Sequence, residues 1–379
     1  MTATTSGRQP GHVVVAPDKF KGSLTAAEVG TAVRAGLLAA QPTLDVRVHP
    51  VADGGDGTLD AAVGAGFERL PVSVSGPVGP PTAAAIAVRD DVAVVELALA
   101  SGLVLLPVDG LEPLAASSFG TGELILAALD KGCTTVVLGV GGSACTDGGA
   151  GMLEALGVRF LDASGVELAR GGGPLVDLAT VDRGGLDPRL AGVDFVLASD
   201  VDNPLLGPRG AAAVYGPQKG ATPADVQRLD AGLARLAAAL DPDAATTPGA
   251  GAAGGVGYAA LAVLGATPRP GIDVILDLVG FRAALDGARL VVTGEGRLDE
   301  QTLHGKAPAG VAAAAVRAAV PVVAVSGGRD RDDARLHAAG FVAAYALTDI
   351  EPDVQRCIDD PVPLLERLGR LIAAEQLPA

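Results

Sequence analysis

The chain has 379 residues, 49% of them hydrophobic, and a formal net charge of −16. This composition excludes a disordered chain, and the negative charge argues against a surface that binds nucleic acid. The length favours two domains over one core.

Cysteine spacing and apolar runs exclude further classes. The three cysteines form no close pair, so neither a disulfide framework nor a zinc site is expected, as in a cytoplasmic protein. Residues 92–108 are apolar but short for a membrane span and include Glu96. Residues 1–11 are polar and predict a loose tail instead of a signal peptide.

The first polar turn follows an apolar run at residues 12–16, which predicts a strand, and precedes a capped helix expected over residues 26–40. The turn contains Asp18, Lys19, Lys21 and Ser23. Two lysines beside a helix N-terminus suit a phosphate or a carboxylate. Lysine is scarce, with five lysines against 23 arginines, so Lys19, Lys21 and Lys306 in glycine-rich turns indicate a use for a compact ammonium.

Acidic residues follow two further apolar runs. The run at residues 46–51 leads into Asp53, Gly54, Gly55 and Asp56, and the run at residues 195–198 leads into Asp200, Asp202 and Asn203. Carboxylate and amide oxygens are ligands that Mg²⁺ prefers, and the glycines allow a close backbone approach. Residue types alone do not divide these four aspartates between metal ligation and a general base.

The amino-acid composition changes from about residue 76, where proline and glycine cluster. A strand pair is expected over residues 83–99, turning at residues 90–91. A helix opening near Gly120 and Thr121 leads to a strand at residues 134–140. Amphipathic spacing predicts a helix over residues 224–240, and further helices are expected at 258–264 and 276–285.

A glycine-rich loop after residue 138 supports two interpretations. Gly139, Gly141 and Ala144 match the dinucleotide fingerprint G-x-G-x-x-A, and Asp162 follows at the expected distance. This favours a NAD-dependent hydroxyacid dehydrogenase. Against it, residues 145–150 stay polar where the helix of that motif should already have begun. The same loop holds Gly142, Ser143 and Asp147, which would then serve another ligand.

The last third of the chain alternates strands and helices. Residues 290–292 predict a buried strand, residues 293–296 a turn containing Glu295, and residues 307–319 a returning helix after Asp299 and Lys306. Further strands are expected at 322–325 and 342–346, and a helix at 361–374. The pattern predicts an α/β fold with a doubly wound, five-stranded parallel sheet. Residues 1–75 and 286–379 would form this domain, interrupted by a second α/β domain over residues 76–285.

Several of these motifs together resemble the bacterial class I glycerate kinases. They are VAPDKFKGSLT (15–25), DGGDGT (53–58), FGTGE (119–123), GGSACTDGG (141–149), DVDNP (200–204) and TGEGRLD (293–299). The resemblance extends from residue 13 to beyond 330. It implies a flavodoxin-like domain paired with a second α/β domain, and phosphorylation of D-glycerate at its 2-hydroxyl with ATP and Mg²⁺.

On this interpretation the loops of both domains meet in an interdomain cleft, and the site residues take three roles. The expected catalytic residues are Lys19, Asp53, Asp200 and Lys306. The expected metal ligands are Asp56 and Asp202. The expected substrate- or ATP-binding residues are Asp18, Lys21, Ser23, Gly54, Gly55, Gly120, Thr121, Gly141, Gly142, Ser143, Asp147, Asn203, Glu295 and Asp299.

Two other functions stay open at this point: the dehydrogenase described above, and a two-domain protein that binds an acid without catalysis. The expected partners are small molecules, D-glycerate and ATP, with neither nucleic acid nor membrane. A cytoplasmic monomer or homodimer is expected.

Overall fold

The computed structural model describes residues 11–107, 109–303, 306–330 and 333–378. The chain divides into two compact units. The first unit combines the chain up to Asp53 with the chain from Ile275 onward, and the second unit runs from Gly54 to Val274. The predicted N-terminal tail, apart from Gly11, lies outside the described residues.

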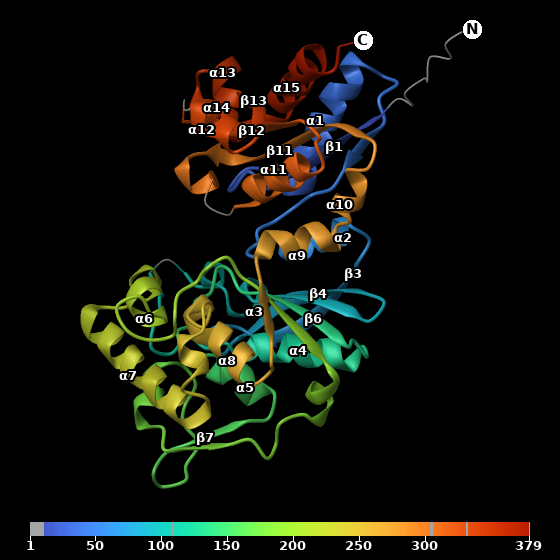
Figure 1. Cartoon of the computed structure of the whole chain (residues 1–379). Helices are drawn as coiled ribbons and strands as arrows, with labels where there is room; N and C mark the ends of the chain where they lie inside the picture. Colours follow the sequence, from blue (N-terminus) through green and yellow to red (C-terminus); the bar gives the residue numbers. More distant parts are fainter. Residues whose placement is uncertain (1–10, 108, 304–305, 331–332, 379) are drawn as a thin grey trace. The chain divides into compact units, whose positions relative to one another are not determined.

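The first unit alternates strands and helices, as its valine-rich runs and capped helical segments predict (Figure 1). Its elements are β1 (His12–Pro17), α1 (Ala26–Ala40), β2 (Val46–Val48), α10 (Phe281–Ala284), β11 (Ala288–Leu298), α11 (Ala307–Arg317), β12 (Val322–Arg329), α12 (Asp333–Ala338), β13 (Phe341–Ala346), α13 (Leu347–Ile350), α14 (Val354–Asp359) and α15 (Pro361–Gln376). The predicted helix over residues 26–40 is confirmed as α1, whose N-terminus carries a capping box between Thr25 and Glu28.

The sheet of the first unit has five parallel strands in the order β13-β12-β11-β1-β2. Val15 of β1 and Val292 of β11 belong to a core shared with α1 and α15, while α11 packs on the opposite face. Because side chains alternate along a strand, Ala16 and Thr293 face the α11 side. Toward the carboxyl ends of β1, β11 and β12, the next side chains on this face therefore lie beside the start of α11.

The second unit is also a mixed α/β structure. Its elements are α2 (Thr58–Gly64), β3 (Glu68–Ser75), β4 (Pro81–Arg89), β5 (Val92–Glu96), α3 (Ala98–Ser101), α4 (Phe119–Asp130), β6 (Thr135–Gly139), α5 (Ala150–Ala155), β7 (Arg159–Leu161), β8 (Thr180–Asp182), β9 (Asp194–Ala198), α6 (Ala211–Tyr215), α7 (Pro223–Leu240), α8 (Val256–Ala262), β10 (Thr267–Arg269) and α9 (Gly271–Leu278), whose last turn passes into the first unit. Its main sheet has the order β10-β9-β6-β5-β4-β3, in which β4 is antiparallel to both neighbours and β3 forms the edge. The predicted α/β class is confirmed.

The unit boundaries differ from the expected positions after residues 75 and 285. The first lies earlier because β3 pairs along its whole length with β4 in the second sheet. The second lies earlier because residues 279–284 are tied to the first unit. His12 Nε2 lies 2.6 Å from the Ala284 carbonyl, and His49 Nδ1 lies 3.0 Å from the Val279 carbonyl.

Two local expectations were wrong. Residues 293–296 do not form a turn; β11 continues to Leu298 because it stays paired with β12 as far as Arg329. Residues 276–285 do not form one helix. The chain breaks between α9 and α10, where Gly280 adopts a left-handed φ of +67°.

Helices α1 and α15 pack at very short range because each has a glycine at the contact. A Cβ placed on Gly36 would lie 2.1 Å from the Glu366 carbonyl oxygen, and one placed on Gly369 would lie 2.6 Å from the Val33 carbonyl oxygen. Real Cβ atoms do not approach so closely, so a side chain at either position must push the helices apart.

We predict that Gly36→Ala lowers the free energy of unfolding by about 1–3 kcal/mol through overpacking, although alanine is the better helix former. The matched control is Gly192→Ala, because a Cβ on Gly192 meets no atom within 4 Å. The control should stay within about 0.5 kcal/mol of the parent protein. Urea unfolding measures both, and equal stability of the two variants would contradict the packing explanation.

Candidate active site

Three polar side chains stand in a row at the carboxyl edge of the first unit's sheet. Glu295 of β11 and Ser326 of β12 are register partners, and both lie on the face of the sheet that packs against α11. Asp18 comes directly after β1, and its backbone N–H donates to the Gly294 carbonyl at 2.8 Å. Ligands of open parallel sheets bind at this edge, so the row stands where chemistry is expected.

Lys306 is the basic partner of this row. It is the N-cap residue of α11, and its Nζ lies 3.2 Å from Glu295 Oε2 and 3.9 Å from Asp299 Oδ1. Burial raises the pKa of Glu295, and the Lys306 ammonium opposes that rise. The structure thus brings together three predicted site residues, Glu295, Asp299 and Lys306.

Two oxygens of the row have no hydrogen-bond partner among the described residues. Glu295 Oε1 and Ser326 Oγ are both buried and unpaired in the described structure. A buried polar atom without a partner costs about 1–3 kcal/mol. The two oxygens are therefore available to a water molecule or to polar groups of a ligand.

Asp18 has the most perturbed carboxyl group of the row. Burial, with the nearby charges of Asp53 and Glu295, raises its pKa to about 7, while the Lys19 backbone N–H and ammonium oppose the rise. That N–H donates to Asp18 Oδ1 at 2.7 Å. A carboxyl group whose pKa lies near neutrality is suited to exchange protons at physiological pH.

The other residues of the first turn are placed differently. Lys21 is exposed, and the Ser23 hydroxyl donates to the Ile358 carbonyl at 2.7 Å. Lys21 is thus accessible to an anion, whereas Ser23 ties its turn to the end of α14.

In the second unit, several predicted binding residues hold the scaffold. Asp147 is fully buried, and its carboxylate accepts from the Ser118 N–H and hydroxyl and from the N–H groups of Gly149 and Gly151. The Thr121 hydroxyl pairs with Ser101 Oγ at 2.9 Å. A Cβ on Gly120 would lie 2.0 Å from the Ser75 carbonyl oxygen.

The acidic loop after β9 is exposed. Asp200 Oδ1 accepts from the Gly271 N–H at 2.9 Å, at the start of α9. Asp202 lies 3.6 Å from Arg209, with most of its side chain in solvent. The Asn203 side chain donates to the Arg209 carbonyl and accepts from the Tyr215 hydroxyl, so it organises the loop.

The loop containing Gly54, Gly55 and Asp56 is held by a residue that sequence reasoning missed. Glu96 is buried, and its carboxylate accepts from the N–H groups of Gly57 and Leu59 at the start of α2. The signal in the sequence is a single glutamate within the apolar run at residues 92–108. Lys219 and Ser326 were missed too: Lys219 ends a 3-10 helix of three residues, and Ser326 lies within β12.

The glycines of the dinucleotide fingerprint have another cause. A Cβ on Gly139 would lie 2.7 Å from the Gly54 carbonyl oxygen, and one on Gly141 would lie 2.5 Å from Gly55 Cα. The next helix, α5, begins only at Ala150. Asp162 accepts from the N–H groups of its own turn, at residues 164 and 166. Close packing of two loops therefore explains these glycines, and the dehydrogenase interpretation finds no support.

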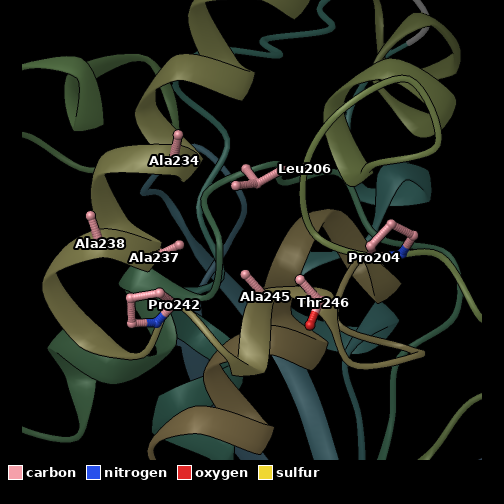
Figure 2. A pocket seen from close by; sticks show the side chains of 8 residues that line it. All are labelled: Pro204, Leu206, Ala234, Ala237, Ala238, Pro242, Ala245 and Thr246. Atoms are coloured by element: carbon pink, nitrogen blue, oxygen red, sulfur yellow. The ribbon is translucent and has the colours of Figure 1, made fainter.

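A pocket beside α7 does not fit a small hydroxy acid (Figure 2). It is lined by Pro204, Leu206, Ala234, Ala237, Ala238, Pro242, Ala245 and Thr246. Its only side-chain polar atom is the Thr246 hydroxyl, so it offers nothing to neutralise a carboxylate or a phosphate. Among the described residues, no helix is long and apolar enough to cross a membrane, and no group of three or more acidic, histidine or cysteine side chains forms a metal cage.

Known proteins match nearly the whole chain. Residues 13–376 match the model of the glycerate kinase family. The chain is 45% identical over 369 residues to the glycerate kinase of Bacillus subtilis (strain 168), covering 96% of this chain and 97% of that protein. It is 43% identical over 343 residues to the glycerate 2-kinase of Escherichia coli (strain K12), covering 88% and 90%.

The chain belongs to the glycerate kinase family. A crystal structure from Salmonella typhimurium LT2 that carries the name glycerate kinase 2 superposes with a TM-score of 0.85 at 42% identity, covering 97% of this chain and 98% of that one. The protein is therefore a kinase of this family, and the resemblance read from the motifs is confirmed.

We predict that Asp18→Asn stabilises the protein most at alkaline pH. The pKa of Asp18 is raised in the folded state, so its contribution to stability is fully present below pH 4 and is lost as the pH rises to about 7. Asparagine cannot ionise, so the variant should melt at a higher temperature than the parent at pH 8, with a smaller difference at pH 5. The exposed control Asp286→Asn should show no such trend. A pH-independent difference for Asp18→Asn would contradict the raised pKa.

Proposed function

We propose that this protein transfers the γ-phosphoryl group of ATP to the 2-hydroxyl of D-glycerate, giving 2-phospho-D-glycerate and ADP. Family membership supports glycerate as the substrate. The observation that carries the proposed chemistry is the row of Asp18, Glu295 and Ser326, with Lys306 beside it. It combines a carboxyl group that titrates near neutrality with an ammonium and two unpaired oxygens.

In the proposed reaction, Asp18 accepts the proton of the attacking hydroxyl. The substrate oxygen bonds to the γ-phosphorus as the bond between that phosphorus and the β,γ-bridging oxygen breaks, and ADP leaves with that bridging oxygen. Asp53 lies close enough to Asp18 to raise its pKa, so it strengthens Asp18 as a base. The ammonium groups of Lys19, Lys21 and Lys306 would neutralise anionic oxygens of the carboxylate and the phosphates.

Residues of both units take part in this proposal. Gly54, Gly55 and the 141–143 turn would approach the substrate with their backbone, while Asp200 and Asn203 shape the loop after β9. Gly120, Thr121 and Asp147 would act through the scaffold that they hold. The parallel strand order of the first unit, 2-1-3-4-5 in sequence terms, supports a flavodoxin-like assignment for that unit.

Mg²⁺ is the metal that such a reaction calls for, and the donor chemistry of the chain fits it. A nucleotide-bound Mg²⁺ keeps water and phosphate ligands and needs only one or two protein carboxylates, so the lack of a cage among the described residues is no obstacle. Asp56 and Asp202 would supply those carboxylates. When bound, the metal would offset charge on the β- and γ-phosphates.

The direct test is turnover with D-glycerate and ATP, followed by phosphorus NMR of the product. We expect ADP release that depends on Mg²⁺ and stops when EDTA is added. The product phosphorus should couple to a single proton, as in a secondary ester. Coupling to two protons would mean 3-phosphoglycerate and would overturn the regiochemistry alone, whereas no ADP release above background would overturn the proposed function.

A second prediction concerns Asp18 as the base. We expect Asp18→Asn to lower kcat by about a hundredfold to ten-thousandfold, the usual contribution of general base catalysis. In the parent protein, kcat/KM should rise with pH and level off above about 7, because the carboxyl group must be ionised. Asp286→Asn is again the control. A parent profile that is flat between pH 5.5 and 8.5 would rule out Asp18 as the base.

A further inference from the structure

The proposed function leaves one fully buried cation unexplained, Lys219. It ends the short 3-10 helix Pro217–Lys219, is 2% exposed, and lies beneath the loop that follows β6. Its ammonium donates to the Ser143 hydroxyl oxygen at 2.9 Å and to the Cys145 carbonyl. Burying a charge is costly, and a residue such as methionine would fill the same space without that cost.

The charge of Lys219 is poorly neutralised. Within the described part of the chain, no carboxylate lies within ion-pair distance of its Nζ. The acid that it senses electrostatically is Asp147, whose oxygens are already engaged by Ser118, Gly149 and Gly151. Burial accordingly lowers the pKa of Lys219. An additional anion near this ammonium would be stabilised by it.

Ser143 connects this buried ammonium to the surface of the loop. Because its oxygen accepts from an ammonium, its own hydroxyl hydrogen must point elsewhere and is a stronger donor. No acceptor for that hydrogen occurs among the residues that the structure describes. Gly142, the neighbouring residue, is exposed, so the loop can be reached from solvent.

The backbone of the 141–143 turn adds three further donors. The turn is fixed from behind, because the Leu103 N–H donates to the Gly142 carbonyl and the Ala144 N–H donates to the Ser101 carbonyl, both at 2.8 Å. Over the described ranges, the N–H groups of Gly141, Gly142 and Ser143 donate to no acceptor. Gly142 adopts a φ of +70°, as in turns whose successive N–H groups gather around an anion.

We propose that the 141–143 turn, the Ser143 hydroxyl and the buried ammonium of Lys219 form an oxyanion-binding site. This deepens the proposed function and rests on it for the source of the oxyanion, either a phosphate of ATP or the carboxylate of glycerate. The Gly54–Asp56 loop packs directly against Gly141, which brings the turn next to the loop of a proposed Mg²⁺ ligand. Lys219 is a positioning residue here, since it acts through Ser143.

The test is isothermal titration of the full-length protein with ATP and, separately, with D-glycerate. The variants are Ser143→Ala, Lys219→Met and their combination. Losing a charge-assisted hydrogen bond should weaken binding of one ligand about tenfold to a hundredfold in each single variant. The ligand that is affected identifies the source of the oxyanion. Because Lys219 acts through Ser143, the double variant should bind within a few-fold of Ser143→Ala.

A matched control separates binding from folding. Lys131→Met removes an exposed lysine at the end of α4. It should leave the affinities unchanged. If Lys219→Met fails to fold, Ser143→Ala alone decides.

Unchanged affinity for both ligands in Ser143→Ala, with or without a lower melting temperature, would overturn the site. So would additive losses in a folded double variant. A parent protein that binds ATP through Ser143 yet releases no ADP with D-glycerate would refute the proposed function and leave this site standing.

Discussion

The parallel pairing of β1 with β11 is the constraint on which the first unit depends. It joins the start of the chain to its last quarter, with Val13 beside Leu290 and Ala16 beside Thr293. The Thr293 hydroxyl reinforces the pairing by donating to the Ala16 carbonyl at 2.7 Å. Once this register is set, the period-2 alternation of both strands places Asp18 and Glu295 on one face. A shift of either strand by one residue would turn the carboxylate of that strand toward the core that packs against α1 and α15.

In the second unit, glycines determine how two loops pack, because they permit direct backbone contact. The loop after β6 and the loop at the start of α2 touch through Gly139, Gly141, Gly54 and Gly55, with no space for a Cβ. The buried Glu96 carboxylate fixes the second of these loops by accepting from its N–H groups. Glycine-rich sequences in this chain thus serve packing, which is why a fingerprint built from glycines misleads here.

The buried polar groups of this protein are of two kinds. Asp147 is satisfied by four donors of its own scaffold, and such a carboxylate rigidifies the fold. Glu295 and Ser326 each keep an unpaired oxygen, and Lys219 keeps an incompletely neutralised charge. These groups lower the stability of the folded protein when no ligand is bound. Polar or charged groups of a ligand would pair with them and offset this loss of stability.

The sequence by itself determined the α/β class, the first helix and the membership of the glycerate kinase family. These depend on local propensity, on hydrophobic period and on motifs that stay contiguous in the chain. It also singled out Asp18, Glu295 and Lys306 as candidate site residues.

Only the tertiary structure decided how those residues are used. The raised pKa of Asp18 comes from burial and from Asp53 and Glu295, which are distant in sequence, so no local pattern could predict it. The pairing of β11 with β12 placed Ser326 beside Glu295, and the fold of the second unit buried Lys219 beneath Ser143. Desolvation and charge proximity are properties of the packed chain, and they separate a solvated acid or lysine from one that is poised for chemistry.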